Sequence, residues 1–285
     1  MRIKKKHNNK YLLSKTGVSW VRDFTTKNVA KIDINNHTSN TDATLFLRNE
    51  IANYRQMNGT LENSRIIHPN IVIVSDGYNW EKGQEILAEL PYKEVAIIGV
   101  NKSLAKWKMV GEQTKVKRAM NFYVVNNPFE ECMRFLPKHG YTPNCIASLR
   151  TNPKFAREYN GQTFFYATSN DKYFSSQIKL DVTIDDYRNP VCAAIQLAYL
   201  FGVQKLLLFC CDDSFDENKP GSSRLKNGLW TYPQQFISQH IIDANLYWLK
   251  KQNVRIGDCS MGIKYDSADY IETEQIPLFF REEYE

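Results

Sequence analysis

The sequence has little of what metal-binding or disulfide-rich proteins need. It contains six cysteines and five histidines in 285 residues, and no two cysteines stand in a Cys-x-x-Cys spacing. Because structural zinc sites usually show such a spacing, we expect no structural metal. Three of the cysteines lie inside apolar runs, where a free thiol behaves as a small core residue, so we expect reduced cysteines and a cytoplasmic location.

Long uninterrupted hydrophobic runs are also absent. The first ten residues are basic, and no apolar segment follows them, so we expect no signal peptide. The most apolar stretch, residues 191–211, is interrupted by Gln196, Gly202 and Lys205. It is typical of a helix, a turn and a strand, and the sequence therefore predicts no transmembrane segment.

Positive charge is concentrated at the N-terminus. Residues 1–31 contain nine lysine and arginine side chains and one aspartate, a net +8, whereas the whole chain is +6, so the remaining residues sum to −2. The body is thus no basic nucleic-acid surface. The arm is either a solvated tail or a contact for nucleic acid, anionic lipid or an acidic partner.

Short apolar runs alternate with helical patterns through most of the chain. This alternation, with β-branched and aromatic runs, predicts an α/β protein: a Rossmann-like, mostly parallel sheet flanked by helices. The predicted strands are Ile71–Ser75, Glu94–Val100, Phe122–Val125, Asn144–Leu149, Thr163–Ala167, Gln204–Cys211 and Val254–Gly257. The predicted helices are 42–57, Trp80–Leu90, Phe129–Leu136, Pro190–Phe201 and Pro233–Lys251, with Gly202 as the C-terminal cap of the fourth.

We divide the chain into three parts. Residues 1–69 form a basic N-terminal extension with one amphipathic helix, residues 70–262 form the Rossmann-like nucleotide-binding core, and residues 263–285 form a C-terminal tail that packs on the core. The composition, 42% hydrophobic and 24% charged, suits one domain that buries a substantial core.

Polar residues that follow the predicted strands are the candidate site, because ligands of open parallel sheets bind at the carboxyl ends of the strands. Neither G-x-G-x-x-G nor a Walker A motif is present. In their place, Asp76 and Gly77 follow the first strand, where glycine permits a close backbone approach to a phosphate; an ordinary turn is the alternative. Asn101 follows the second strand, with donor and acceptor atoms that suit a base or ribose.

The third strand and the long apolar helix are each bordered by asparagines. Asn126 and Asn127 follow the third strand, and we expect either nucleotide contacts or, for Asn127 before a proline, helix capping. Asn189 is expected at the start of the long helix beside Arg188, which is our strongest phosphate-binding candidate. The alternative is an ion pair between Arg188 and the preceding aspartates.

The strand that begins near Gln204 ends in two carboxylates, Asp212 and Asp213. We expect them to act in catalysis, either as Mg²⁺ ligands or by orienting a substrate hydroxyl. The polar segment 214–228 after them predicts a mobile loop that covers the substrate. His240, in the last predicted helix, is either a general base or a structural histidine.

From Ile71 to Ser260 the order of motifs resembles the 6-hydroxymethylpterin diphosphokinase-like family. That family includes motility-associated-factor proteins and is similar in fold to Rossmann-like bacterial sialyltransferases. The motifs are IVIVSDGYNW, EVAIIGVN, FYVVNNP and PVCAAIQLAYLFGVQKLLLFCCDDSF. The resemblance implies a nucleotide-dependent transferase: a diphosphokinase with ATP, Mg²⁺ and Asp212 or Asp213 near the metal, or a glycosyltransferase that holds a nucleotide sugar near Asn101 and Asn126 or Asn127.

Three functions therefore stay open at this point. The chain transfers a diphosphoryl group from ATP to a small hydroxylated acceptor, or transfers a sugar from a nucleotide sugar, or binds a nucleotide or polyanion without catalysis. The third arises because the first turn, Ser75-Asp76-Gly77-Tyr78, differs from the Gly-Pro-Ser-Leu of that family. The sequence specifies neither the acceptor nor the oligomeric state.

Overall fold

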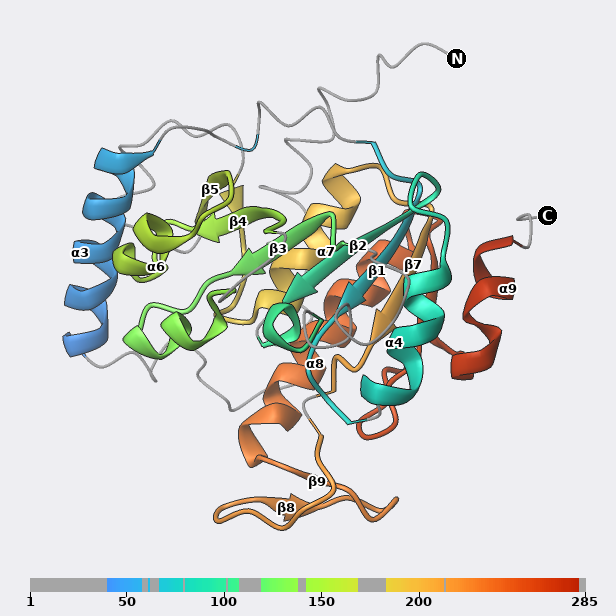
Figure 1. Cartoon of the computed structure of the whole chain (residues 1–285). Coiled ribbons are helices and arrows are strands. Elements are labelled where there is room, and N and C mark those ends of the chain that lie inside the picture. The colour runs from blue at the N-terminus through green and yellow to red at the C-terminus, as the bar shows by residue number, and fades with distance from the viewer. Residues whose placement is uncertain are drawn as a thin grey trace.

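The structure is a computed structural model (Figure 1), and it describes residues 40–57, 61, 67–78, 80–100, 102–107, 119–137, 142–168, 183–212 and 214–281. The basic arm, residues 1–31, with Asn101 and Asp213, lies outside the described residues. No helix among the described residues is long and apolar enough to cross a membrane.

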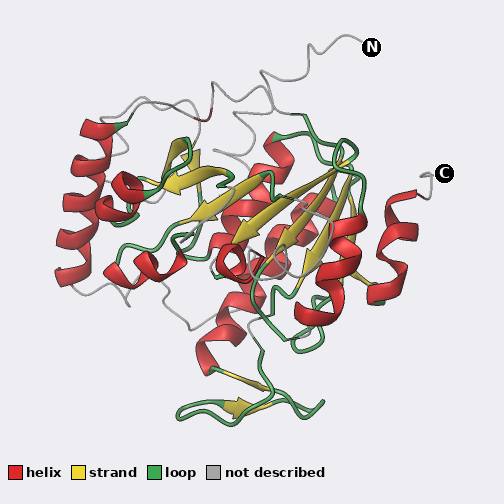
Figure 2. Cartoon of the chain, viewed as in Figure 1, coloured by secondary structure: helices red, strands yellow, loops and turns green. Residues whose placement is uncertain are grey.

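The described chain alternates strands and helices, as Figure 2 shows. The strands of the main sheet are β1 (Asn70–Val74), β2 (Val95–Val100), β3 (Phe122–Val125), β4 (Asn144–Ser148), β5 (Thr163–Thr168), β6 (Thr183–Ile184), β7 (Lys205–Phe209), β10 (Arg255–Asp258) and β11 (Asp269–Tyr270). A small hairpin adds β8 (Ser223–Arg224) and β9 (Trp230–Thr231). The helices are α3 (Asn40–Gln56), α4 (Trp80–Glu89), α6 (Pro153–Glu158), α7 (Pro190–Leu200), α8 (Pro233–Lys250) and α9 (Ile276–Arg281), with 3-10 helices η3 (Glu130–Phe135) and η4 (Thr273–Gln275).

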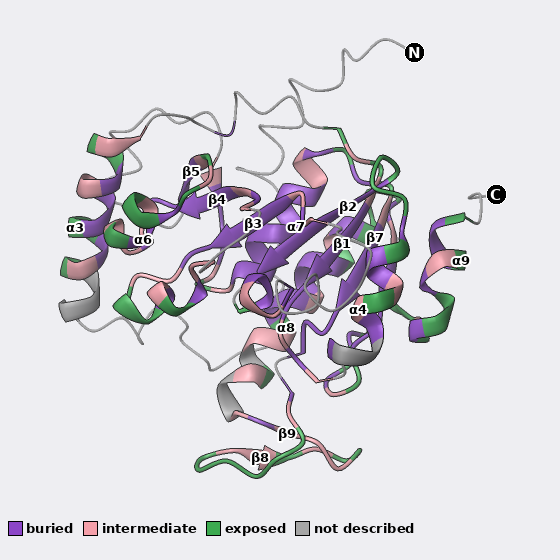
Figure 3. Cartoon of the chain, in the orientation of Figure 1, coloured by how far each residue is buried: buried purple, intermediate pink, exposed green. Residues whose placement is uncertain are grey.

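The predicted fold class is confirmed. The sheet has nine strands in the order β11-β10-β7-β1-β2-β3-β4-β5-β6, and every pairing within it is parallel. The central strands are buried along nearly their whole length, as Figure 3 shows in purple. Because both faces of these strands are buried, their sequences are continuous apolar runs and do not alternate between apolar and polar residues.

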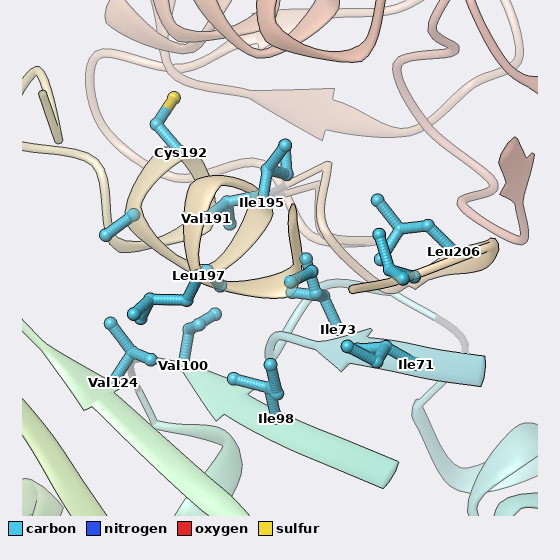
Figure 4. Packing of buried hydrophobic residues seen from close by; sticks show 14 of the residues in the cluster. Ile71, Ile73, Ile98, Val100, Val124, Val191, Cys192, Ile195, Leu197 and Leu206 are labelled. Atoms are coloured by element: carbon cyan, nitrogen blue, oxygen red, sulfur yellow. The ribbon is translucent and has the colours of Figure 1, made fainter. Parts of the chain in front are cut away.

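Helices cover the two faces of the sheet, and each face has its own apolar core. On one face α7 packs on side chains of the central strands such as Ile71, Ile73 and Ile98, which lie on the strands below this helix in Figure 4, and α8 packs beside α7 and on β10. On the other face α4, α6 and α9 cover Val72, Ile97 and their neighbours. Successive strand residues point to opposite faces, so a single apolar run supplies both cores.

The seven predicted strands are present to within two residues at either end. Gly202 ends α7 as expected: its φ is +76°, and the amides of Gly202 and Val203 donate to the carbonyls of Tyr199 and Ala198. That pattern is a Schellman motif, in which glycine accepts the left-handed conformation without a Cβ penalty.

Two segments show detail that the sequence did not specify. The helix expected over residues 129–136 is present as the 3-10 helix Glu130–Phe135, a form that occurs in short runs of i→i+3 bonds. In the polar segment 214–228, Phe215 and β8 pair through the backbone with β9, which forms a hairpin that stands out from the body in Figure 1. The role of this segment as a mobile cover of the substrate stays a prediction.

The chain leaves β1 and its neighbour β7 toward opposite faces of the sheet. After β1 it enters α4, which belongs to one core, and after β7 it reaches α8, which belongs to the other. The two strands are paired over their whole length. The carboxyl ends of β1 and β7 are therefore the topological switch point, the usual place of a ligand in an open α/β sheet.

Candidate functional site

The turn after β1 lies directly on the end of β7. The Ser75 amide donates to the Phe209 carbonyl and the Gly77 amide to the Cys210 carbonyl, each at 3.0 Å. A Cβ on Gly77 would collide with Oδ1 of Asp212 and lie 2.7 Å from the Cys210 carbonyl oxygen. Only glycine fits this approach, because its neighbours are a carboxylate and a carbonyl oxygen. The close approach of a phosphate to this turn stays a prediction.

Asp212 is a buried carboxylate with one oxygen engaged and one without a partner. Only 3% of the residue is exposed. Its Oδ2 accepts hydrogen bonds from the Ser214 hydroxyl, at 2.6 Å, and from the Gly262 amide. Its Oδ1 has no hydrogen-bond partner in the described part of the chain. Burial raises the pKa of Asp212, and the hydrogen bonds from Ser214 and Gly262 oppose that rise.

A second buried carboxylate, Asp258, ends the neighbouring strand β10. Asp258 is 2% exposed, and its Oδ1 accepts a hydrogen bond from the Ser260 amide at 3.0 Å. Burial is the main reason why the pKa of Asp258 rises to about 7, and the charge of Asp212 raises it further. Each of these two carboxyl groups is therefore harder to ionise than an isolated aspartate.

A cation lies on the other side of the β1 turn. Lys106 belongs to a short helical segment, residues 103–107, that follows β2. Its Nζ donates to the Asp76 carbonyl at 2.7 Å and lies 5.8 Å from the centroid of the Trp80 ring. We call Gly77, Lys106, Asp212, Ser214, Asp258 and Gly262 the switch-point group.

The backbone between β7 and Asp212 is held in an uncommon conformation. Cys210 has a φ of +55°, a region in which a non-glycine residue costs on the order of 1 kcal/mol. Its thiol donates to the Tyr78 carbonyl at 3.0 Å. Strained residues of this kind concentrate at functional sites, and here the strain lies two residues before the buried carboxylate.

A second polar cluster lies farther along the same edge of the sheet, and we call it the outer group: Asn126, Arg150, Tyr166, Asp186 and Arg188. The Asp186 carboxylate accepts a hydrogen bond from the Tyr166 hydroxyl at 2.9 Å and from the Arg188 amide at 3.0 Å. Burial raises the pKa of Asp186, while these two bonds, the charge of Arg150 and the side chain of Asn126 lower it. The cluster thus joins the ends of β3, β4, β5 and β6.

Side chains of helix α3 contact the two arginines of the outer group. The guanidinium groups of Arg188 and Arg150 lie 4.8 and 5.4 Å from the centroid of the Phe46 ring. Nε of Arg150 also forms a 2.7 Å ion pair with Oε1 of Glu50. Cations over an aromatic face are attracted by its quadrupole, so Phe46 holds both arginines beside the start of α7.

The predicted site residues therefore separate into two groups. Asp76, Gly77 and Asp212 meet at the switch point, and Arg188 and Asn126 belong to the outer group. Asn189 caps α7, because its Oδ1 accepts a hydrogen bond from the Val191 amide at 2.8 Å. Asn127 does not cap η3, whose N-cap is Phe129; its Oδ1 accepts from the Phe129 amide at 2.8 Å in the turn before that helix. His240 is exposed on α8, and Asn101 and Asp213 lie outside the described residues.

Sequence reasoning missed two residues of the switch-point group that matter for its charge. Asp258 directly follows the predicted strand Val254–Gly257, so the strand-end rule used for Asp212 would have found it. The strand-end rule does not find Lys106, because this residue lies six positions after the end of β2. Its sequence context is that of an ordinary lysine in a helix.

The fit of the predicted Mg²⁺ depends on Asp212. Among the described residues no three or more His, Cys, Asp and Glu side chains are grouped as metal ligands. Of the Asp212 carboxylate, only Oδ1 is available, since Ser214 and Gly262 engage Oδ2. Mg²⁺ is usually held by one or two carboxylates together with substrate phosphates. Asp212 therefore fits one ligand of a cation that arrives with a nucleotide, and Asp213, the second predicted ligand, lies outside the described residues.

One solved structure gives a specific fold comparison. The chain is similar to the MAf glycosyltransferase from Magnetospirillum magneticum AMB-1, with a TM-score of 0.61 and 15% sequence identity. The match covers 81% of this chain and 39% of that protein, so the chain spans about two fifths of its length. No protein-family model matches the chain, and no curated protein sequence matches it. The two proteins share a Rossmann-like fold, which agrees with the expected resemblance to motility-associated-factor proteins.

Proposed function

We propose that this chain is a glycosyltransferase that moves a sugar from a nucleotide sugar to a hydroxylated acceptor. The fold likeness to a glycosyltransferase supports this function over diphosphoryl transfer from ATP, for which the comparisons offer no counterpart. Fold alone does not define chemistry, so the proposal rests on one observation in the site: the buried Oδ1 of Asp212, which has no partner among the described residues and faces the β1 turn.

The role of Asp212 follows from this geometry. A buried acceptor atom without a donor is costly, and a substrate hydroxyl placed at the switch point removes that cost. In the transfer, the acceptor oxygen forms a bond to the anomeric carbon, the bond from that carbon to the donor phosphate breaks, and the hydroxyl proton passes to Asp212. A carboxylate with a raised pKa is a better proton acceptor than an ordinary aspartate.

The test is a screen for turnover with nucleotide sugars. The full chain is incubated with a panel of nucleotide sugars, a mixture of sugar acceptors, and Mg²⁺ or EDTA, and the released nucleotide is measured. We expect release with at least one donor, and Asp212→Asn should reduce it by about 10²–10⁴-fold while the circular dichroism spectrum stays unchanged. Asp216→Asn, an exposed carboxylate of the hairpin segment, is the matched control and should keep full turnover.

The same screen separates the competing functions. Turnover of ATP to AMP with a pterin acceptor, and none with any nucleotide sugar, would establish the diphosphokinase function instead. Full loss of nucleotide-sugar turnover in EDTA would place Mg²⁺ in the reaction, and retention would exclude a need for it. A contact of the basic arm with nucleic acid stays a separate prediction, which requires binding that weakens steeply with salt.

A further inference from the structure

We infer that Lys106 is the residue that binds the phosphate of the nucleotide donor, at the carboxyl end of β1. This inference rests on the proposed function, because it assigns a ligand to the same switch-point group. Lys106 is fixed there by its 2.7 Å hydrogen bond to the Asp76 carbonyl. That carbonyl belongs to the residue before Gly77, whose Cα faces the partner-free oxygen of Asp212.

The position of Lys106 places a full positive charge next to a helix start. Nζ lies 5.8 Å from the centroid of the ring of Trp80, the first residue of the ten-residue helix α4. The first amides of a helix have no partners within the helix and attract anions. An ammonium group beside them adds a point charge of the same sign, and lysine is a common phosphate ligand.

The buried carboxylates explain why a cation is needed at this position. Asp212 and Asp258 are both almost fully buried on the β7 and β10 side of the same turn, and a negatively charged phosphate near them is repelled. Lys106 offsets that repulsion on the β2 side. We assign Asp212 Oδ1 to the acceptor hydroxyl and Lys106 to the departing phosphate, because both groups face the same β1 turn.

Within the described part of the chain, Nζ has hydrogen-bonding capacity left for a ligand. An ammonium group has three donors, and the Asp76 carbonyl takes one of them. Trp107, the next residue, is buried against Trp80 with the two ring centroids 6.1 Å apart. This packing fixes the backbone of the helical segment, so Lys106 needs little ordering when a phosphate binds.

The test compares nucleotides with nucleosides on the full chain. Isothermal titration calorimetry measures the affinity of wild type, Lys106→Met and Lys102→Met for UDP, CMP, uridine and cytidine. We expect Lys106→Met to weaken nucleotide binding by about 10- to 100-fold, the effect of one charge-assisted hydrogen bond. Nucleoside affinity should not change. Lys102 is exposed and lies four residues earlier, so Lys102→Met removes the same charge and should leave both affinities as in wild type.

Each outcome either supports or overturns the role of Lys106. Wild-type nucleotide affinity in Lys106→Arg, which keeps the positive charge, supports the role of Lys106. This variant remains informative if Lys106→Met does not fold. Wild-type nucleotide affinity in folded Lys106→Met, or no binding of either nucleotide to the wild-type chain, overturns that role. Lys106-dependent nucleotide binding without any sugar transfer would reject the proposed function and keep this inference. Sugar transfer by Lys106→Met with an unchanged KM for the nucleotide sugar would keep the proposed function and reject this inference.

Discussion

At the scale of single residues, the site is defined by carboxylates that the fold removes from water. Asp186, Asp212 and Asp258 each follow a strand of the sheet, and burial raises the pKa of all three. Structural carboxylates that are paired with cations have lowered pKa values instead. Raised values at the carboxyl edge of a parallel sheet are what proton-transfer chemistry requires, and they make the stability of the protein depend on pH.

We predict that Asp258→Asn removes part of this pH dependence. The pKa of Asp258 is about 7 in the folded chain and about 3.9 when unfolded. Between these values the folded state binds more protons than the unfolded state, so stability falls as pH rises from about 4 to about 7 and is constant above. The variant keeps an oxygen for the Ser260 amide. We measure the free energy of unfolding in urea at pH 4.5 and at pH 7.5. From the lower to the higher pH, this free energy should fall on the order of 3 kcal/mol more in the wild type than in the variant.

Equal losses in the two proteins would contradict this assignment, because Asp258 would then titrate alike in the folded and unfolded states. Asp266→Asn is the matched control, since Asp266 is exposed and its removal should leave the wild-type pH dependence intact.

At the scale of secondary-structure elements, α3 is more than an addition to the core. The side chain of Asn49 donates to the carbonyls of Pro128 and Arg150, each at 3.0 Å. The side chain of Asn53 donates to the carbonyls of Leu149 and Thr151 at 2.9 and 2.6 Å. The helix thus supplies donors to main-chain carbonyls that follow β3 and β4. The side-chain amides of Asn49 and Asn53, together with Phe46, hold the outer group in place.

We predict that Asn53→Leu destabilises the fold by about 2–4 kcal/mol, because two buried carbonyls lose their donor at once. Urea unfolding monitored by circular dichroism measures the change. Arg55→Ala, an exposed change on the same helix, should alter stability by no more than about 0.5 kcal/mol. If both variants unfold at the same urea concentration as wild type, α3 is not a structural part of the outer group.

At the scale of the whole molecule, the core on the α4 face of the sheet is completed by the C-terminal helix α9. Helix α9 buries Ile276, Phe279 and Phe280 in the cluster that includes the apolar side chains of α4. The Lys205 ammonium donates to the Phe280 carbonyl at 3.0 Å, which ties the end of α9 to the start of β7. The face that supports the Gly77 turn therefore depends on a helix from the opposite end of the chain.

We predict that truncation after residue 262 abolishes cooperative unfolding. It removes the buried side chains of Ile263, Ile276, Phe279 and Phe280, which contribute about 1.5–3 kcal/mol each, together with buried Tyr265. Phe279→Ala provides a milder test and should cost about 3–5 kcal/mol. The readout is the thermal unfolding transition followed by tryptophan fluorescence. Leu278→Ala, at a position that is 54% exposed, should leave the transition unchanged. A sharp wild-type transition in the truncated chain would show that α9 is dispensable.

The sequence by itself determined the strands, most helices and their caps. Apolar runs, asparagine before proline and Gly202 after α7 are local signals, because they depend on the period of the backbone and on the conformations open to each residue. Only the tertiary structure decided that β7 pairs with β1 across more than a hundred residues. Strands that are buried on both faces show no pattern that selects a neighbour, since parallel pairing is non-local. That pairing places Asp212 on Gly77, and the fold of the β2 connection brings Lys106 to the same turn.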